Sequence, residues 1–180
     1  MRNIVVYCGA NMGLDPVYAV GARDFASELV SQNIGLVYGG GNRGLMGLIA
    51  TAVVASGGKV TAVIPEHINN MGAGYVDGCE FHLVADMHAR KKKMADLADA
   101  AVALPGGYGT LEEIFEFLTW TQLKIHRKPC GLLNTANYYN DLIRFLYRSS
   151  VEGFIPFDNL GLLTIEDQPN KLIEALRRRL

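Results

Sequence analysis

A glycine-rich segment that ends in two acidic residues has the composition of a ligand site with chemistry beside it. Pro105-Gly106-Gly107-Tyr108-Gly109-Thr110-Leu111-Glu112-Glu113 follows a short apolar run and precedes a stretch of helical periodicity. Glycines at a strand-to-helix turn allow close approach of a ligand, and the start of the helix offers free N–H groups and a positive dipole end to phosphate. The segment therefore predicts an anion site next to a carboxylate. It lacks the Gly-Lys-Ser/Thr ending of a P-loop NTPase.

A second glycine cluster, Gly39-Gly40-Gly41-Asn42-Arg43-Gly44, lies between an apolar run and a helical pattern from Leu45 to about Ala55. Its spacing matches a dinucleotide-binding turn, and Glu66 follows about where a ribose-binding acid would lie. The alternative is that these glycines only let helix and sheet pack closely. Because a dinucleotide site needs one such loop, the presence of two favours a small phosphorylated ligand held from both sides.

Cations are concentrated between the two glycine loops, in Asp86-Met87-His88-Ala89-Arg90-Lys91-Lys92-Lys93. Asp86 has the residue type of a helix N-cap. Cations in the first turns oppose the helix dipole, and a bound phosphate would offset that cost. We therefore expect Arg90 and Lys91 to contact phosphate or sugar oxygens, and Lys92 and Lys93 to lie on a solvated face.

Glu113 has two interpretations. Thr110 and Glu113 have the spacing of a capping box, in which Thr110 caps the helix and Glu113 reaches back to the N–H of Thr110. The same carboxylate, at a helix start beside a phosphate loop, is also well placed for chemistry. A metal centre is not expected, because His67, His82, His88 and His126 form no pair with helical ligand spacing.

Strands and helices must alternate to position these segments. Continuous apolar runs, typical of strands covered on both faces, occur at residues 4–7, 34–38, 60–64, 81–84, 100–104, 130–133 and 162–165. Helical spacing connects Tyr18 to Leu29, Leu142 with Phe145 and Leu146, and Leu172 to Leu180. We expect an α/β, Rossmann-like fold, doubly wound, with a mainly parallel sheet flanked by helices, in a single domain over residues 1–180. The longest stretch predicted as neither strand nor helix, Glu66–Gly78, is in a place where loops often cover a ligand.

Composition excludes several functional classes. The chain has 180 residues, 49% of them hydrophobic, and 17 Lys+Arg against 18 Asp+Glu, so we expect neither nucleic acid nor an anionic membrane as partner. No apolar run approaches the roughly 20 residues that span a bilayer, and the start has no signal-peptide architecture. Cys8, Cys79 and Cys130 lack the spacing of a disulfide framework or zinc site. These features favour a cytoplasmic protein.

In combination, the motifs resemble the Lonely Guy family, whose members are cytokinin riboside 5′-monophosphate phosphoribohydrolases and have often been labelled lysine decarboxylases. The resemblance covers nearly the whole chain. It is carried by Gly39–Gly47, Met87-His88-x-Arg90-Lys91, Pro105–Glu113 and Thr119-Trp120-x-Gln122-Leu123. The decarboxylase label has no support here, because no lysine stands out as a Schiff-base partner for pyridoxal phosphate.

The resemblance implies hydrolysis of the N-glycosidic bond of N6-modified adenosine 5′-monophosphates to free base and ribose 5-phosphate, with no cofactor. It implies that Arg90 and Glu113 are the catalytic pair. It also implies a homodimer, and an acidic residue near position 72, which the segment Asn69–Gly74 lacks. The residues expected to bind the substrate or its phosphate are Gly40, Gly41, Gly44, Met87, Lys91, Gly106, Gly107, Tyr108, Gly109, Thr110, Leu111, Glu112 and Thr119.

The expected partner is a small-molecule nucleoside monophosphate. Functions other than cytokinin nucleotide hydrolysis stay open. The protein could be a nucleosidase acting on AMP or other nucleoside monophosphates, a non-catalytic nucleotide or cofactor carrier, or an NAD(P)-binding module built on Gly39–Gly44. Arg90 with Glu113 favours catalysis, since a pure binder has no need of a carboxylate near phosphate. The helix from Leu111 to Leu123 carries apolar residues on more than one face, Phe117 and Trp120 among them, which fits a buried core helix or, as we favour, one that meets a partner subunit.

Overall fold

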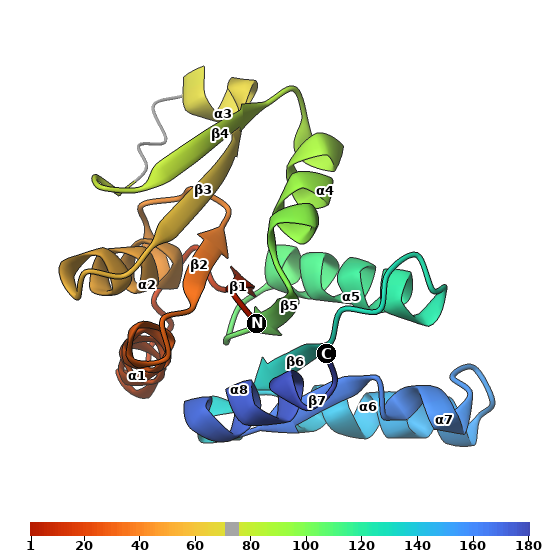
Figure 1. Cartoon of the computed structure of the whole chain (residues 1–180). Helices are drawn as coiled ribbons and strands as arrows, with labels where there is room; N and C mark the ends of the chain where they lie inside the picture. Colours follow the sequence, from red (N-terminus) through yellow and green to blue (C-terminus); the bar gives the residue numbers. More distant parts are fainter. Residues whose placement is uncertain (71–75) are drawn as a thin grey trace.

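The computed structural model describes residues 1–70 and 76–180, and within them one seven-stranded sheet packed between helices (Figure 1). Position 72, near which the resemblance implies an acidic residue that this chain lacks, lies outside the described residues. In chain order the elements are β1 (Asn3–Tyr7), α1 (Val17–Ser31), β2 (Gly35–Tyr38), α2 (Gly44–Ala55), β3 (Val60–Pro65), α3 (Glu66–Asn70), β4 (Glu80–Val84), α4 (Met87–Leu97), β5 (Ala100–Ala103), α5 (Tyr108–Gln122), β6 (Cys130–Leu133), the 3₁₀ turn η1 (Thr135–Asn137), α6 (Asn140–Val151), α7 (Phe157–Leu160), β7 (Leu163–Glu166) and α8 (Pro169–Arg177).

The strand order β4-β3-β2-β1-β5-β6-β7 reverses direction between β1 and β5, and every neighbouring pair is parallel. This confirms the predicted doubly wound fold. In such sheets ligands bind outside the carboxyl ends of the strands where the order reverses. The loops that follow β1 and β5 leave the sheet at this place, and the second glycine cluster follows the adjacent β2.

Two hydrophobic cores cover the two faces of the sheet. Alternate strand residues such as Ile4 and Leu36 pack with α1, α2 and α8 on one face. Their neighbours Val5 and Val37 pack with α4, α5 and α6 on the other. Burial on both faces explains why the central strands read as continuous apolar runs instead of alternating ones. The edge strand β4 is the exception, since Phe81 and Leu83 are exposed.

One expectation for an individual segment is wrong. Glu66–Gly78 is not an uninterrupted loop, because α3 occupies Glu66–Asn70. Phe145 follows the helical spacing of α6 but does not join the core, since it is 64% exposed, whereas Leu142 and Leu146 pack inward.

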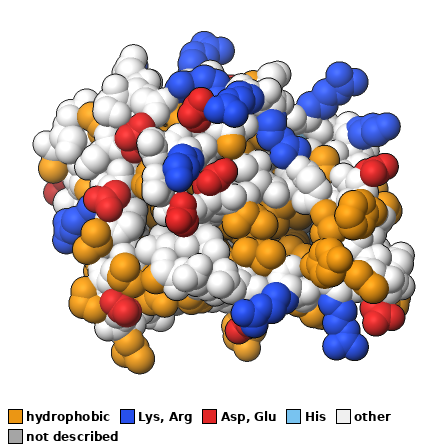
Figure 2. Space-filling view, turned by 90° about the horizontal axis from the view of Figure 1, so that it is seen from below, with side chains coloured by type: hydrophobic (Ala, Val, Ile, Leu, Met, Phe, Trp, Pro, Cys, Tyr) orange, Lys and Arg blue, Asp and Glu red, His pale blue; other side chains and the backbone are white. Residues whose placement is uncertain are grey.

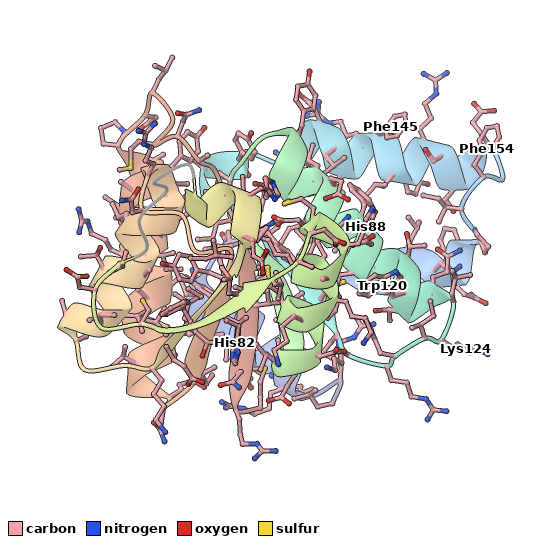
Figure 3. The ribbon with its side chains drawn as sticks, turned by 90° about the horizontal axis from the view of Figure 1, so that it is seen from above. His82, His88, Trp120, Lys124, Phe145 and Phe154 are labelled. Carbon is pink, nitrogen blue, oxygen red and sulfur yellow. The ribbon has the colours of Figure 1, made fainter. Side chains whose placement is uncertain are left out.

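Exposed hydrophobic side chains gather around α6 and α7. Figure 2 shows the molecule from the side of α6, α7 and α8, with hydrophobic side chains concentrated over the half that holds α6 and α7. Figure 3 places Phe145 on α6 and Phe154 just beyond its end, both at the outer edge of the molecule. Within the described segments, no helix has the length and apolar character needed to cross a membrane.

Candidate active site

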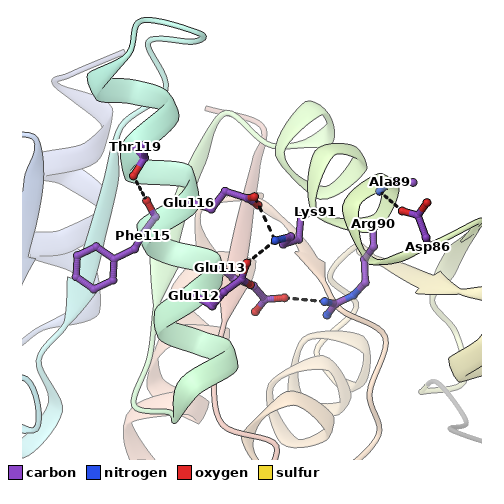
Figure 4. A network of polar contacts seen from close by, with 9 residues as sticks. All are labelled: Asp86, Ala89, Arg90, Lys91, Glu112, Glu113, Phe115, Glu116 and Thr119. Atoms are coloured by element: carbon purple, nitrogen blue, oxygen red, sulfur yellow. Dashed lines mark hydrogen bonds and ion pairs between the residues drawn. The ribbon is translucent and has the colours of Figure 1, made fainter.

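An ion pair between Arg90 and Glu113 lies at the centre of the site (Figure 4). Arg90 Nη1 donates to Glu113 Oε1 at 2.7 Å, and the two side chains are only 10% and 12% exposed. Arg90 comes from the first turn of α4 and Glu113 from the second turn of α5. Helices that follow β4 and β5 thus bring together two residues that are 23 positions apart in sequence.

Local sequence explains where the two helices begin. Asp86 is the N-cap of α4, as predicted, and accepts a hydrogen bond from the backbone N–H of Ala89 at 2.8 Å. The predicted capping box is wrong: α5 begins at Tyr108 with Gly107 as N-cap, so Thr110 already lies inside the helix. Glu113 is consequently one turn too far along to reach the helix start, and its carboxylate bonds to Arg90 instead.

Burial and charge act in opposite directions on Glu113. Removal of the carboxylate from water raises its pKa above the ordinary value, while the nearby charge and hydrogen bond of Arg90 lower it. Burial is the larger effect, so the pKa of Glu113 is raised. A carboxyl group with a raised pKa is better suited to exchange protons near neutral pH than an exposed glutamate is.

Lys91 stands beside this pair in a second ionic cluster. Its ammonium group donates to the carboxylates of Glu112 and Glu116, in the latter case at 3.1 Å. Lys91 is buried, whereas the Glu112 side chain is 54% exposed. Lys91 therefore ties α4 to α5 and orients Glu112, while Lys92 projects to solvent as predicted.

A cavity of about 560 Å³ opens in front of Glu113 at the reversal of strand order. That volume is within the range of roughly 300–1,000 Å³ typical of small-molecule sites. The glycine loop after β5 forms one wall, and Arg90 and Met87 form another. Of the residues predicted to contact the ligand, this cavity brings together Met87, Arg90, Gly106, Gly107, Tyr108, Gly109, Thr110, Glu112 and Glu113.

A neighbouring cavity of about 730 Å³ is lined by the start of the Gly39–Gly44 cluster. Gly39, Gly40 and Gly41 line it, with Met87 and Arg90 shared between the two cavities. Its other walls combine the apolar side chains of Met46, Pro65 and Ile68 with the polar residues Asn11, Asn42 and Arg43. Gly44 lines neither cavity, and a Cβ atom at this position would meet the backbone of Ala10 and Asn11 instead.

Three predicted binding residues lie elsewhere. Thr119 donates to the backbone carbonyl of Phe115 at 2.7 Å and lines a separate apolar groove between α5, α6 and β7. Leu111 packs into the hydrophobic core, and Lys91 serves the ionic cluster with Glu112 and Glu116. Helical geometry explains the position of Thr119: it is six residues after Glu113, and rotation by about 100° per residue places it about 120° away from Glu113 around α5.

The loop after β1 also belongs to the site, since its residues 8–13 line the first cavity, and none of them was among the predicted binding residues. The N–H of Gly9 donates to the carbonyl of Pro105 at 3.0 Å, and the carbonyl of Gly9 accepts from the N–H of Leu45 at 3.0 Å. Gly9 thereby connects both glycine loops. Gly9 and Gly13, directly after an apolar run, repeat the strand-then-glycine signal of the two clusters, and this pattern could have identified the loop.

Two tyrosines far along the chain also hold the glycine loop after β5. Tyr138 Oη donates to the carbonyl of Gly106 at 2.7 Å, and Tyr139 Oη donates to the carbonyl of Leu104 at 2.6 Å. Tyr18 packs edge-on against Tyr138, with 5.5 Å between ring centroids, and both line the cavity. No spacing signal in the sequence connects residues 138 and 139 to a loop more than 30 positions earlier.

In the part of the chain that the structure describes, no cluster of three His, Cys, Asp or Glu residues could hold a metal ion. Cys8 borders the cavity but is buried, and burial raises the pKa of its thiol far above the usual range. The charged groups that line this cavity are the Arg90–Glu113 pair and Glu112, and Asn11, Thr110 and Tyr138 are among its polar side chains.

Comparisons with known proteins find sequence matches over most of the chain. Residues 46–176 match a protein family described as "Possible lysine decarboxylase". The chain is 50% identical to cytokinin riboside 5′-monophosphate phosphoribohydrolase LOG1 of Arabidopsis thaliana, over 97% of this chain and 82% of that protein. It is 45% identical to the probable cytokinin riboside 5′-monophosphate phosphoribohydrolase LOGL2 of rice, Oryza sativa subsp. japonica, over 97% of this chain and 72% of that protein.

Solved structures share the fold at low sequence identity. The molybdenum cofactor carrier protein of Chlamydomonas reinhardtii has a TM-score of 0.73 at 19% identity, covering 99% of this chain and 97% of that one. Fold and site together define a Rossmann-like α/β protein with an arginine–carboxylate pair at the reversal of strand order. The matches over nearly the whole chain specify it further: it belongs to the Lonely Guy family of cytokinin riboside 5′-monophosphate phosphoribohydrolases.

Proposed function

We propose that the protein hydrolyses the N-glycosidic bond of N6-modified adenosine 5′-monophosphates, releasing the free base and ribose 5-phosphate. The observation that carries this proposal is the buried Arg90–Glu113 pair facing a cavity whose opposite wall is a glycine loop at a helix start. The relatives named as phosphoribohydrolases supply the reaction class. A site built only to hold a phosphorylated ligand has no use for a buried carboxylate.

The two cavities set the orientation of the substrate. The 5′-phosphate binds at Gly106–Thr110, where the free N–H groups and positive dipole end of α5 favour an anion. The ribose lies between this loop and Glu113. The base extends past Arg90 and Met87 toward the apolar walls at Met46 and Ile68. Phosphate binding thus holds the sugar at the carboxylate through contacts remote from the bond that breaks.

Glu113 acts where positive charge develops. As the glycosidic bond breaks, its electron pair leaves with the base, which takes up a proton from the solvent, and the ribose ring becomes oxocarbenium-like. The ionised carboxylate of Glu113 stabilises that charge and takes a proton from the water that attacks the anomeric carbon. Arg90 holds the carboxylate in place and keeps it ionised against the effect of burial. Glu112, oriented by Lys91, contacts the substrate from the cavity rim. No cofactor takes part in these steps.

A second substrate class, unmodified AMP, is favoured by one feature of the site. The second cavity is open and its apolar walls accept an N6 substituent without requiring one. The matched experiment therefore measures release of base from isopentenyladenosine 5′-monophosphate and from AMP at equal concentration, by liquid chromatography. A higher kcat/KM for the modified nucleotide supports the proposed substrate class. Equal values, or a preference for AMP, would support the nucleosidase alternative, and release of neither base would support a carrier.

We also propose that the protein is a cytoplasmic homodimer. Support for a dimer comes from α6, none of whose residues is buried, and from Phe154, which is 85% exposed. Phe145, Tyr147 and Phe157 extend the same surface, next to an apolar groove of about 250 Å³ that Thr119 lines. An apolar patch of this kind marks an interaction site. The patch is continuous with α5, which carries Glu113, so a second copy covering it would also support the site.

A further inference from the structure

The guanidinium group of Arg90 lies directly against the backbone of Gly39, the residue that follows β2. A Cβ atom built on Gly39 would lie 2.8 Å from Arg90 Cζ and 3.3 Å from Nε, and would overlap with Nη2. Nη1 of the same guanidinium donates to Glu113. Arg90 is therefore held between a backbone surface on one side and the carboxylate on the other.

Conformational strain does not explain why residue 39 is a glycine. Gly40 and Gly44 have φ angles of +80° and +58°, in the left-handed region that favours glycine. Gly39 is not among the residues with positive φ, so alanine can adopt its backbone conformation. Space is the remaining constraint, and it is a side chain of the site, Arg90, that occupies that space.

The other glycines of this cluster meet different neighbours. A Cβ on Gly40 would meet the side chain of Ile64, and one on Gly41 would meet the end of the Met46 side chain. A Cβ on Gly44 would collide with the backbone of Ala10 and Asn11. The cluster therefore serves close packing in most places, and Gly39 alone among these four borders the guanidinium.

We propose that Gly39 is a positioning residue for the hydrolysis, which sets the place of the Arg90 guanidinium and through it the orientation of Glu113. This inference rests on the proposed function of the Arg90–Glu113 pair. It assigns the first glycine residue of the cluster to catalytic geometry instead of phosphate binding. Even a side chain of one carbon atom would push the guanidinium away from the position in which it meets Glu113.

The test is Gly39→Ala, with Gly35→Ala as the matched control. Displacement of a group in an active site by about 1 Å can cost about 100-fold in rate, so kcat for the nucleotide should fall roughly 10- to 100-fold in Gly39→Ala. Affinity for ribose 5-phosphate should stay unchanged, because the phosphate loop lies on α5. Gly35 is the first residue of β2, the strand that Gly39 follows, and a Cβ there would press on the Asn3 side chain far from the site. Gly35→Ala should therefore change thermal stability but not kcat.

A double-mutant cycle separates positioning from general destabilisation. In an Arg90→Ala background the guanidinium is gone, so Gly39→Ala should have no further effect on kcat. If Gly39→Ala alone fails to fold, the double variant should fold, because the crowded space has been vacated. Equal effects of Gly39→Ala with and without Arg90, or wild-type kcat in the single variant, would overturn the proposal.

A titration distinguishes failure of this inference from failure of the proposed function. Moving Arg90 away removes the charge and hydrogen bond that lower the pKa of Glu113, so this pKa should rise further in Gly39→Ala. Carbon-13 NMR of the glutamate side chains measures this shift without any substrate. If the wild-type protein releases no base, the hydrolase proposal fails. If the pKa of Glu113 is the same in the wild type and in Gly39→Ala, the positioning proposal fails.

Discussion

Replacing Glu113 by glutamine removes the charge of the proposed catalytic carboxylate while preserving its size. The amide oxygen of glutamine can still accept the hydrogen bond that Arg90 donates at 2.7 Å. Because Glu113 does not cap α5, the substitution leaves the start of this helix unchanged. The expected loss therefore concerns the negative charge and the basic oxygen alone.

The size of the loss follows from the burial of Glu113. A unit charge about 4 Å from a developing cation contributes about 4 kcal/mol at the effective dielectric constant of about 20 that suits protein sites. Since about 1.4 kcal/mol corresponds to a factor of ten in rate, kcat should fall by about three orders of magnitude. Loss of a general base gives a similar range, roughly 10²- to 10⁴-fold.

The assay measures release of base from isopentenyladenosine 5′-monophosphate, together with melting temperature and binding of ribose 5-phosphate. We expect Glu113→Gln to lose turnover with little change in either of the other two quantities. Glu112→Gln is the control, because Glu112 is about half exposed and faces Lys91 and not Arg90. It should mainly raise KM. Turnover of Glu113→Gln within a few-fold of the wild type would refute the catalytic role of Glu113.

Three further predictions concern pH, the cysteines and the assembly. Because burial raises the pKa of Glu113 and the reaction needs the ionised form, activity should fall on acidification with a midpoint above the ordinary value of 4.5; a pH–rate profile with its acid limb at or below that value would contradict the assignment. Burial raises the pKa of the Cys8 thiol far above the usual range and that of Cys130 to about 12, so alkylation of the folded protein should leave activity largely intact; loss of activity in step with labelling of one cysteine would argue against this. Phe154→Glu should convert a dimer into a folded monomer in light scattering, and a wild-type protein that is monomeric at micromolar concentration would refute the dimer.

The sequence predicted those features that follow from local periodicity. Continuous apolar runs identified the strands because both faces of the sheet are covered. The residue type at position 86 identified the start of α4 correctly. The glycine segment after β5 was expected to start a helix and does so at Tyr108. Each of these depends on residues within a few positions of one another.

Features that depend on packing between distant segments were not predictable in this way. Thr110 and Glu113 have capping-box spacing, but Arg90, brought in by another helix, binds the carboxylate. Tyr138 reaches Gly106 only because β6 places η1 beside the site. Phe145 continues a helical spacing but lies on the exposed side of α6. For Glu113 and Tyr138, a residue far away in the chain determines the outcome.

The most direct test of the proposed hydrolysis compares one nucleotide with its own nucleoside. Isopentenyladenosine 5′-monophosphate and isopentenyladenosine are incubated separately with the protein, and base, ribose 5-phosphate and ribose are quantified by mass spectrometry. We predict equimolar base and ribose 5-phosphate from the monophosphate, and a kcat/KM at least about 100-fold lower for the nucleoside, because the loop from Gly106 to Thr110 then has no phosphate to hold. Comparable rates on the two compounds, or release of inorganic phosphate instead of base, would contradict the account.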